Sequence, residues 1–175
     1  MNEAINSGVP AAIRYPSGRE QSDVIRRFYK NNDFEKIGIK CDFDPSTELD
    51  AIIVTHGRIT SEAIKAADKL SAMGVKAGII LLEKLKPYTE SAELIAKAIP
   101  SSARALLFLE EEIRSGGAGM NLSDKLSDFL AKRGIKSDVL AIDDSFVSFV
   151  KEGQSIYEAA GVDCENICSR IRKML

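Results

Sequence analysis

The stretch Asp50-Ala51-Ile52-Ile53-Val54-Thr55-His56-Gly57 decides the fold class of this 175-residue chain. Its four consecutive apolar residues, followed by a polar stop at a glycine, are typical of a strand that is buried on both faces. Thr60 and Ser61 then begin a helix whose apolar residues recur at helical spacing until Gly74 ends it. A buried strand followed directly by an amphipathic helix predicts one unit of a parallel α/β sheet.

The same unit recurs along the rest of the chain. Further apolar strands are predicted at residues 75–82, 105–109 and 137–142, and helices at residues 91–99, after 116–119, around 156–157 and over 163–175. Repeated strand-helix units with short loops give a mostly parallel sheet with helices on both faces. We therefore predict an α/β fold, a three-layer α/β/α sandwich.

The first 47 residues are less regular. Ser22 is a suitable cap for a helix that ends near residue 29, residues 36–40 alternate like an edge strand, and residues 44–47 read as a turn. The interpretation is a polar connector over residues 1–47, followed by one domain over residues 48–175.

Composition excludes several classes of function. The net charge is −2, so a general electrostatic attraction to nucleic acid or to anionic lipid is not expected. No apolar run approaches the roughly 20 residues that cross a bilayer, and no secretory signal precedes the first strand. The three cysteines are an odd set without disulfide spacing, which favours reduced thiols and a cytoplasmic protein.

Candidate site residues follow the predicted strands, because ligands of such sheets bind at the carboxyl ends of the strands. These ends carry His56-Gly57-Arg58, Glu83-Lys84, Glu110-Glu111-Glu112 and Asp143-Asp144. His56 is the only histidine, so any imidazole chemistry must use it, although a single histidine at a strand end is more often structural.

Three other features are each given a structural interpretation. The glycine-rich stretch 116–119 lacks the dinucleotide-binding spacing, and close packing of a helix on the sheet is favoured over anion binding. The glutamates at 110–112 are expected in a solvated loop or at an acidic edge that faces a partner, since a metal would need further ligands. Cys164 and Cys168 lie four residues apart on an apolar helix stripe and are expected to be packed thiols.

Several ordered motifs resemble one known family. The motifs are Ile13-Arg14-Tyr15-Pro16 with Gly18, residues 50–57, Leu85-Lys86-Pro87, Glu110-Glu111 with residues 116–119, and Gly161-Val162-Asp163. In type, order and spacing they resemble the C-terminal domain of 1-deoxy-D-xylulose-5-phosphate synthases, which are thiamin-diphosphate enzymes of the transketolase group. The resemblance covers nearly the whole chain and implies a transketolase C-terminal-domain-like fold.

The resemblance also implies roles for particular residues. In that family the domain packs beneath the pyrimidine-binding domain, stabilises a dimer and offers arginines to the phosphate of glyceraldehyde 3-phosphate. Arg14 matches one such anchor, and Lys84 and His56 are further candidates for binding the substrate phosphate. Glu83 stands where the family has arginine, so a different ketose or aldehyde phosphate is an open alternative. Residues 1–47 would then include the end of the preceding pyrimidine-binding domain.

The resemblance implies a transferase only when the other domains are present. The Gly-Asp-Gly…Asn motif that holds the metal and the diphosphate of thiamin enzymes is absent from this sequence. We therefore expect no catalytic residue, no metal and no cofactor in the chain alone, with thiamin diphosphate and magnesium in the full-length enzyme. The expected partners are the other two domains, in the same polypeptide or in a separate subunit, and a second copy in a homodimer; the chain would be an excised fragment or a split-gene product.

Two alternatives to this function remain open. One is a non-catalytic docking or scaffold module, and the other is the C-terminal subunit of a split transketolase that uses another sugar phosphate.

Overall fold

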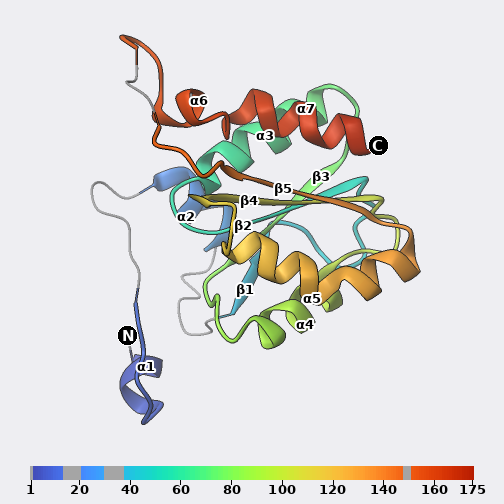
Figure 1. The fold of residues 1–175 in the computed structure, drawn as a ribbon. Helices are drawn as coiled ribbons and strands as arrows, with labels where there is room; N and C mark the ends of the chain where they lie inside the picture. Colours follow the sequence, from blue (N-terminus) through green and yellow to red (C-terminus); the bar gives the residue numbers. More distant parts are fainter. Residues whose placement is uncertain (1, 14–20, 30–37, 148–150) are drawn as a thin grey trace.

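The computed structural model describes residues 2–13, 21–29, 38–147 and 151–175, and Figure 1 shows their arrangement. The elements in chain order are α1 (Asn2–Asn6), α2 (Ser22–Phe28), β1 (Ile39–Cys41), β2 (Ala51–Thr55), α3 (Thr60–Ala72), β3 (Ala77–Leu82), α4 (Tyr88–Ala98), β4 (Ala105–Ile113), α5 (Ala118–Arg133), β5 (Lys136–Ile142), α6 (Ile156–Ala160) and α7 (Cys164–Met174). None of the described helices combines the length and the apolar character that crossing a bilayer requires.

The sheet is mostly parallel, as the strand-helix pattern predicts. Its order is β1-β3-β2-β4-β5, and only β1 at one edge runs antiparallel to its neighbour. α3 and α7 cover one face and α4 and α5 cover the other (Figure 1). The predicted three-layer α/β/α sandwich is therefore confirmed.

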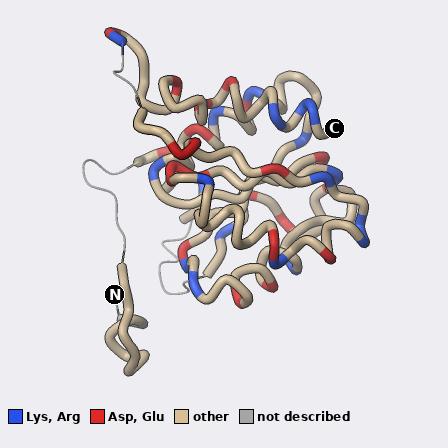
Figure 2. The backbone as a smooth tube through the Cα atoms, in the orientation of Figure 1, with Lys and Arg blue, Asp and Glu red and all other residues tan. Residues whose placement is uncertain are grey.

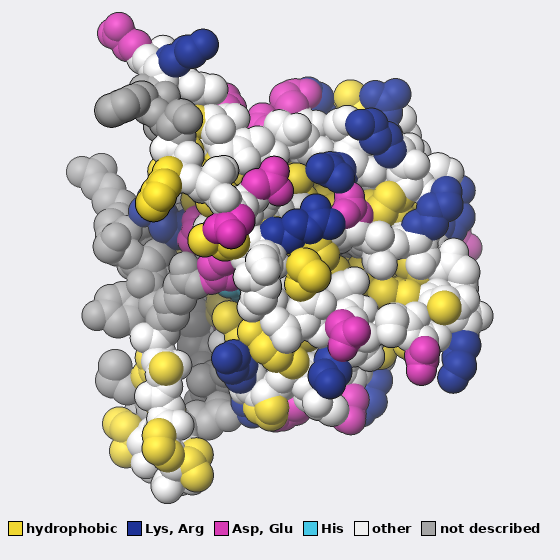
Figure 3. Space-filling view, viewed as in Figure 1, with side chains coloured by type: hydrophobic (Ala, Val, Ile, Leu, Met, Phe, Trp, Pro, Cys, Tyr) yellow, Lys and Arg dark blue, Asp and Glu magenta, His cyan; other side chains and the backbone are white. Residues whose placement is uncertain are grey.

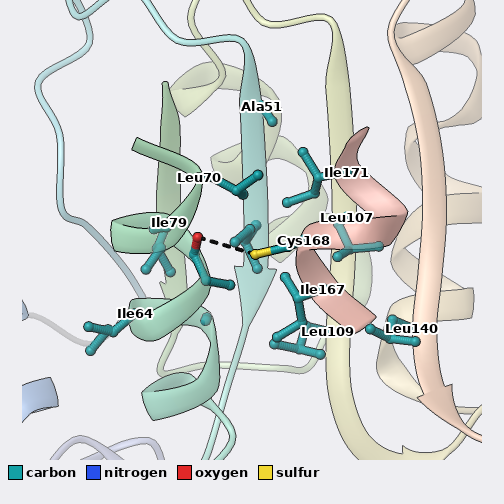
Figure 4. Packing of buried hydrophobic residues seen from close by; sticks show 14 of the residues in the cluster. Ala51, Ile64, Leu70, Ile79, Leu107, Leu109, Leu140, Ile167, Cys168 and Ile171 are labelled. Atoms are coloured by element: carbon teal, nitrogen blue, oxygen red, sulfur yellow. Dashed lines mark hydrogen bonds between the residues drawn. The ribbon is translucent and has the colours of Figure 1, made fainter. Parts of the chain in front are cut away.

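Strand alternation divides the core between the two faces of the sheet. Ile53 and Leu107 face α3 and α7, whereas Ile52 and Phe108 face α4 and α5. Figure 4 shows the first of these clusters, in which Cys168 points into the space between α7 and α3. Its thiol donates a weak hydrogen bond to the carbonyl oxygen of Ala66, 3.7 Å away. Because both faces of the central strands are covered, these strands have no polar face.

β4 and α4 are among the elements whose bounds differ from the expected ones. β4 does not end at Leu109 but continues through the glutamates to Ile113, which pairs with Ile142 of β5 beyond a register shift. α4 begins at Tyr88, three residues earlier than the sequence pattern indicates, with Pro87 in extended backbone just before it.

Within the first 47 residues, the described stretches 21–29 and 38–47 contact the sandwich. Phe28 of α2 is buried in the cluster that α3 and α7 cover, and β1 extends the sheet. Arg27 joins these parts, with its Nε 2.7 Å from Asp42 and its Nη1 2.8 Å from Asp68 of α3. α1 lies apart from the sandwich in Figure 1. The domain boundary at residue 47 stays a prediction.

Candidate functional site

His56, Glu110 and Glu112 come together at the carboxyl ends of β2 and β4. Thr55 pairs with Leu109 in the parallel register, so His56 lies level with Glu110 on the next strand. Alternate residues of a strand share one face, and Glu110 and Glu112 therefore follow Phe108 on the α5 side of the sheet. Gly57 then turns the chain into α3 with φ 70°, a left-handed conformation that favours glycine.

The three side chains are close enough to act together. Nε2 of His56 lies 3.2 Å from Oε2 of Glu112 and 3.9 Å from Oε2 of Glu110. One nitrogen or oxygen of each residue lies within 4.8 Å of the others. The side chains of His56, Glu110 and Glu112 are 10%, 1% and 24% exposed, so the group is closed on the Glu110 side and opens toward solvent at Glu112.

Glu110 is the most buried member of this group. Its Oε2 accepts a hydrogen bond of 3.0 Å from the backbone N–H of Gly119, in the first turn of α5. A helix N-terminus favours negative charge, so this contact stabilises the carboxylate. Its Oε1 has no hydrogen-bond partner among the described residues. The prediction that the glutamate run forms a solvated loop or an exposed acidic edge was wrong for Glu110.

The glycines before and within α5 make room for this carboxylate. A Cβ at Gly119 would lie 3.0 Å from Cγ1 of Val139 and 3.1 Å from Cβ of Phe108. A Cβ at Gly117 would collide with Oε1 of Glu110 and lie 2.8 Å from the carbonyl oxygen of Ile113. The preference for close packing over an external anion at residues 116–119 is confirmed, because the protein's own carboxylate occupies the helix N-terminus.

A small cavity borders the buried part of the group. It is lined by Val54, His56, Leu82, Phe108, Leu109, Glu110, Ala118, Gly119 and Leu122, and its volume is about 10 Å³. That is roughly the space in which a single water can be placed. His56 and Glu110 are the polar residues of this lining, and the other lining residues are apolar.

Glu111 faces the opposite side of the sheet. Its Oε2 accepts a hydrogen bond of 3.1 Å from the hydroxyl of Tyr157 in α6. Burial and the neighbouring carboxylate raise the pKa of Tyr157 to about 12. Glu110 and Glu112 thus face one side of the sheet and Glu111 faces the other, where its hydrogen bond connects α6 to β4. Figure 2 shows acidic positions gathered around this end of β4.

Glu83 and Lys84, after β3, have partners of their own. Glu83 accepts a hydrogen bond of 2.6 Å from the hydroxyl of Tyr29, and burial, then the bond to Glu83, raises the pKa of Tyr29. Nζ of Lys84 lies 3.0 Å from both carboxylate oxygens of Glu90 in α4. The ion pairs of the described residues thus place Lys84 and His56 in separate groups, and Arg14 lies outside the described residues.

The sequence pattern predicted both His56 and the glutamate run at strand ends, but it did not predict that Glu110 and Glu112 approach His56. The signal for this approach is strand alternation: in a strand that extends past Leu109, Glu110 and Glu112 fall on one face, next to the residue after Thr55. The interpretation of Cys164 and Cys168 as packed thiols is confirmed for Cys168, which is buried, while Cys164 is half-buried. Burial raises the pKa of the Cys164 thiol to about 11.

Comparison with known proteins defines the family. The family described as "Transketolase, C-terminal domain" matches residues 40–167. The chain belongs to this family. The resemblance that the ordered motifs indicated is therefore confirmed, and with it the transketolase C-terminal fold.

Curated relatives of this transketolase C-terminal domain are named 1-deoxy-D-xylulose-5-phosphate synthase. The protein from Pseudomonas syringae pv. tomato is 33% identical over 95% of the chain, which covers 24% of that relative. The protein from Dehalococcoides mccartyi is 28% identical over 98% of the chain, which covers 26% of it. The chain thus spans about a quarter of the length of the curated relatives it matches.

A solved structure has the same fold. A protein described as a split gene transketolase, an inactive β4 tetramer, is similar with a TM-score of 0.62 and 24% identity, over 76% of this chain and 43% of the other.

Proposed function

We propose that this transketolase C-terminal domain is part of a thiamin-diphosphate-dependent transferase similar to 1-deoxy-D-xylulose-5-phosphate synthase. The whole enzyme would join pyruvate, after decarboxylation, to glyceraldehyde 3-phosphate. The supporting observation is the similarity to relatives of that name over nearly the entire chain, 95% of it in Pseudomonas syringae pv. tomato. The cofactor and its magnesium ion would be held by the other domains.

The proposed contribution of this domain is assembly surface and a phosphate anchor. Arg14 is the proposed anchor, because a guanidinium binds a phosphate through two parallel hydrogen bonds. Lys84 is a second candidate, although it must leave its ion pair with Glu90 to reach a phosphate. His56 lies between two carboxylates, an environment that suits a cation better than an anion.

The proposed partners are the two cofactor-binding domains of the same enzyme, in one polypeptide or in a separate subunit. We also propose that the enzyme is a homodimer and is located in the cytoplasm. The chain alone is expected to be inactive.

A chimera tests the proposal. In the Pseudomonas syringae relative, the matching C-terminal quarter is replaced by this chain, and product formation from pyruvate and glyceraldehyde 3-phosphate is measured. We expect turnover by the chimera and none by the isolated chain. Arg14→Ala should raise the KM for glyceraldehyde 3-phosphate about 10- to 150-fold, the loss of one charge-assisted contact.

Arg104→Ala is the matched control, because Arg104 pairs with Asp50 at the amino ends of the strands, whereas ligands of such sheets bind at the carboxyl ends. It should leave that KM unchanged. An unchanged KM in Arg14→Ala would remove Arg14 from the phosphate site. Turnover or thiamin diphosphate binding by the isolated chain would contradict the proposed division of roles.

Glu83 supports a second candidate, a transketolase-type subunit for another sugar phosphate. Its carboxylate is held by Tyr29 at the position where the synthase pattern has arginine, so one cation for the substrate phosphate is replaced by a negative group. The chimera distinguishes the two candidates, since turnover with a different aldehyde or ketose phosphate favours the second. A chimera that folds and assembles without any turnover favours the docking or scaffold module.

A further inference from the structure

We propose that His56, Glu110 and Glu112 bind a divalent transition-metal ion of the zinc class, one per chain. The sequence predicted no metal in this chain, because the Gly-Asp-Gly…Asn motif is absent and the glutamate run has no second cluster of ligands beside it along the chain. The sheet brings the histidine and the two glutamates together at the ends of two neighbouring strands. His56 and Glu110 are 54 positions apart in the sequence.

The first observation is the convergence of three ligand atoms. An imidazole nitrogen and two carboxylate oxygens lie within 4.8 Å of one another. An ion about 2.0–2.2 Å from each ligand atom would bring such atoms to mutual separations of about 3–4 Å. The separations of Nε2 from Glu112 and Glu110, 3.2 Å and 3.9 Å, are already in that range.

The second, independent observation is the state of the buried polar atoms. Nε2 of His56 and Oε1 of Glu110 are both buried, and neither makes a well-aligned hydrogen bond among the described residues, although Oε2 of Glu112 lies 3.2 Å from Nε2. Buried polar groups in native proteins are nearly always hydrogen-bonded, so two buried atoms without a well-aligned hydrogen bond, on residues that line one small cavity, indicate a missing ligand. A metal ion held by Nε2 and by the carboxylate of Glu110, whose Oε2 lies 3.9 Å from Nε2, would supply a partner at this place.

The rest of the surroundings fits a cation. Two carboxylates lie beside one imidazole, and a divalent ion would be attracted to both carboxylates. The Gly119 N–H already fixes the orientation of Glu110 through its Oε2, as outer-shell donors do for ligating carboxylates. The partly exposed Glu112 gives the ion a path from solvent. Figure 3 shows acidic side chains gathered on this side of the molecule.

The ligand types select the class of metal. Magnesium and calcium prefer six or more oxygen ligands, whereas one imidazole with two carboxylates suits zinc and its neighbours in the first transition row. Three protein ligands leave a fourth position for water. Because the ligands come from the ends of β2 and β4, the ion would hold these strand ends together and raise the stability of the fold.

Zinc titration of the chelator-stripped chain tests the proposal. We expect one Zn²⁺ per chain by calorimetry and a melting temperature that rises with zinc concentration. His56→Asn and Glu112→Gln should each weaken binding by at least about 10- to 100-fold, the loss that even outer-shell substitutions cause. Circular dichroism in the absence of metal checks that both variants are folded.

The cysteines supply the necessary control, since thiols also bind zinc. Cys164→Ser and Cys168→Ser should keep the stoichiometry and the affinity. In a parallel titration, Co²⁺ should give the spectrum of nitrogen and oxygen ligands without a thiolate charge-transfer band. The proposal is overturned by an absence of zinc binding, by unchanged affinity in His56→Asn and Glu112→Gln, or by binding that disappears with the cysteines. Saturation by Mg²⁺ in place of Zn²⁺ would overturn the assigned class of ion.

Discussion

Gly117 is the residue on which the position of Glu110 depends most directly. A side chain at Gly117 would have to displace either the buried carboxylate of Glu110 or the carbonyl oxygen of Ile113, 2.8 Å from the added carbon. Its φ of −63° is ordinary, so close packing and not backbone conformation requires glycine here. This distinguishes Gly117 from turn glycines such as Gly57.

Gly117→Ala should lower the free energy of unfolding by about 1–3 kcal/mol, the usual cost of an overpacked site. Urea denaturation followed by circular dichroism measures the change. Gly38→Ala is the matched control, because among the described residues its added methyl group meets a side-chain carbon of Leu94 at 3.7 Å, an ordinary contact. The control should stay within about 0.5 kcal/mol of the parent chain. Equal stability of the two variants would show that Glu110 is not packed as described.

Asp50 lies where the amino ends of β2, β3 and β4 meet. The His56 group lies at the carboxyl ends of the same sheet. The backbone N–H of Asp50 donates to the carbonyl of Lys76 before β3, and its carbonyl accepts from the N–H of Arg104 before β4. Its carboxylate accepts from the Lys76 N–H and from Nη2 of Arg104, both at 2.9 Å. The hydrogen bond from Lys76, and then that from Arg104, lowers the pKa of Asp50 below its ordinary value of 3.8.

This shift determines the sign of a pH effect. A carboxyl group whose pKa is lower in the folded state stabilises the fold above its ordinary pKa, and that stabilisation is lost as pH falls through the folded pKa. Asp50→Asn should therefore be less stable than the parent by about 1 kcal/mol at pH 7. The difference should shrink as the pH falls below about 4. Urea denaturation from pH 7 to pH 3 measures it.

Asp128→Asn, at an exposed position on α5, is the control and should change the stability at pH 7 by less than about 0.5 kcal/mol. A difference between Asp50→Asn and the parent that grows with acid would contradict the argument.

The sheet divides the protein into two cores that share the same strands. Ile171 of α7 is fully buried in one core and Ile95 of α4 in the other. Successive residues of each central strand point alternately into the two cores. Loss of packing in one core therefore loosens the strands that also form the other core. The two cores are therefore expected to unfold together.

Ile171→Ala and Ile95→Ala should each lower the free energy of unfolding by about 2–5 kcal/mol, because each leaves a cavity in a closed core. Ile156→Ala changes an isoleucine that is 58% exposed and should cost less than about 0.5 kcal/mol. Calorimetry should show one cooperative transition in all three variants. A variant with two separated transitions would contradict the coupling of the two cores.

The sequence by itself determined the layers, the mostly parallel sheet and the family. These depend on local patterns: apolar runs such as residues 51–54, helical spacing after Thr60, and motifs that lie close together along the chain. The strands and helices can be predicted from the sequence because burial of one face requires apolar residues at the spacing of a strand or of a helix.

Only the tertiary structure decided the surroundings of His56. Whether Glu110 is buried or solvated depends on where β4 ends, and β4 is prolonged by its pairing with β5, at Ile113 and Ile142. The approach of His56 to Glu112 depends on the register between strands that are far apart in the sequence. The contacts of His56 with the two glutamates form because the sheet places the ends of β2 and β4 side by side. The spacing of residues along the chain does not predict which strand ends become neighbours.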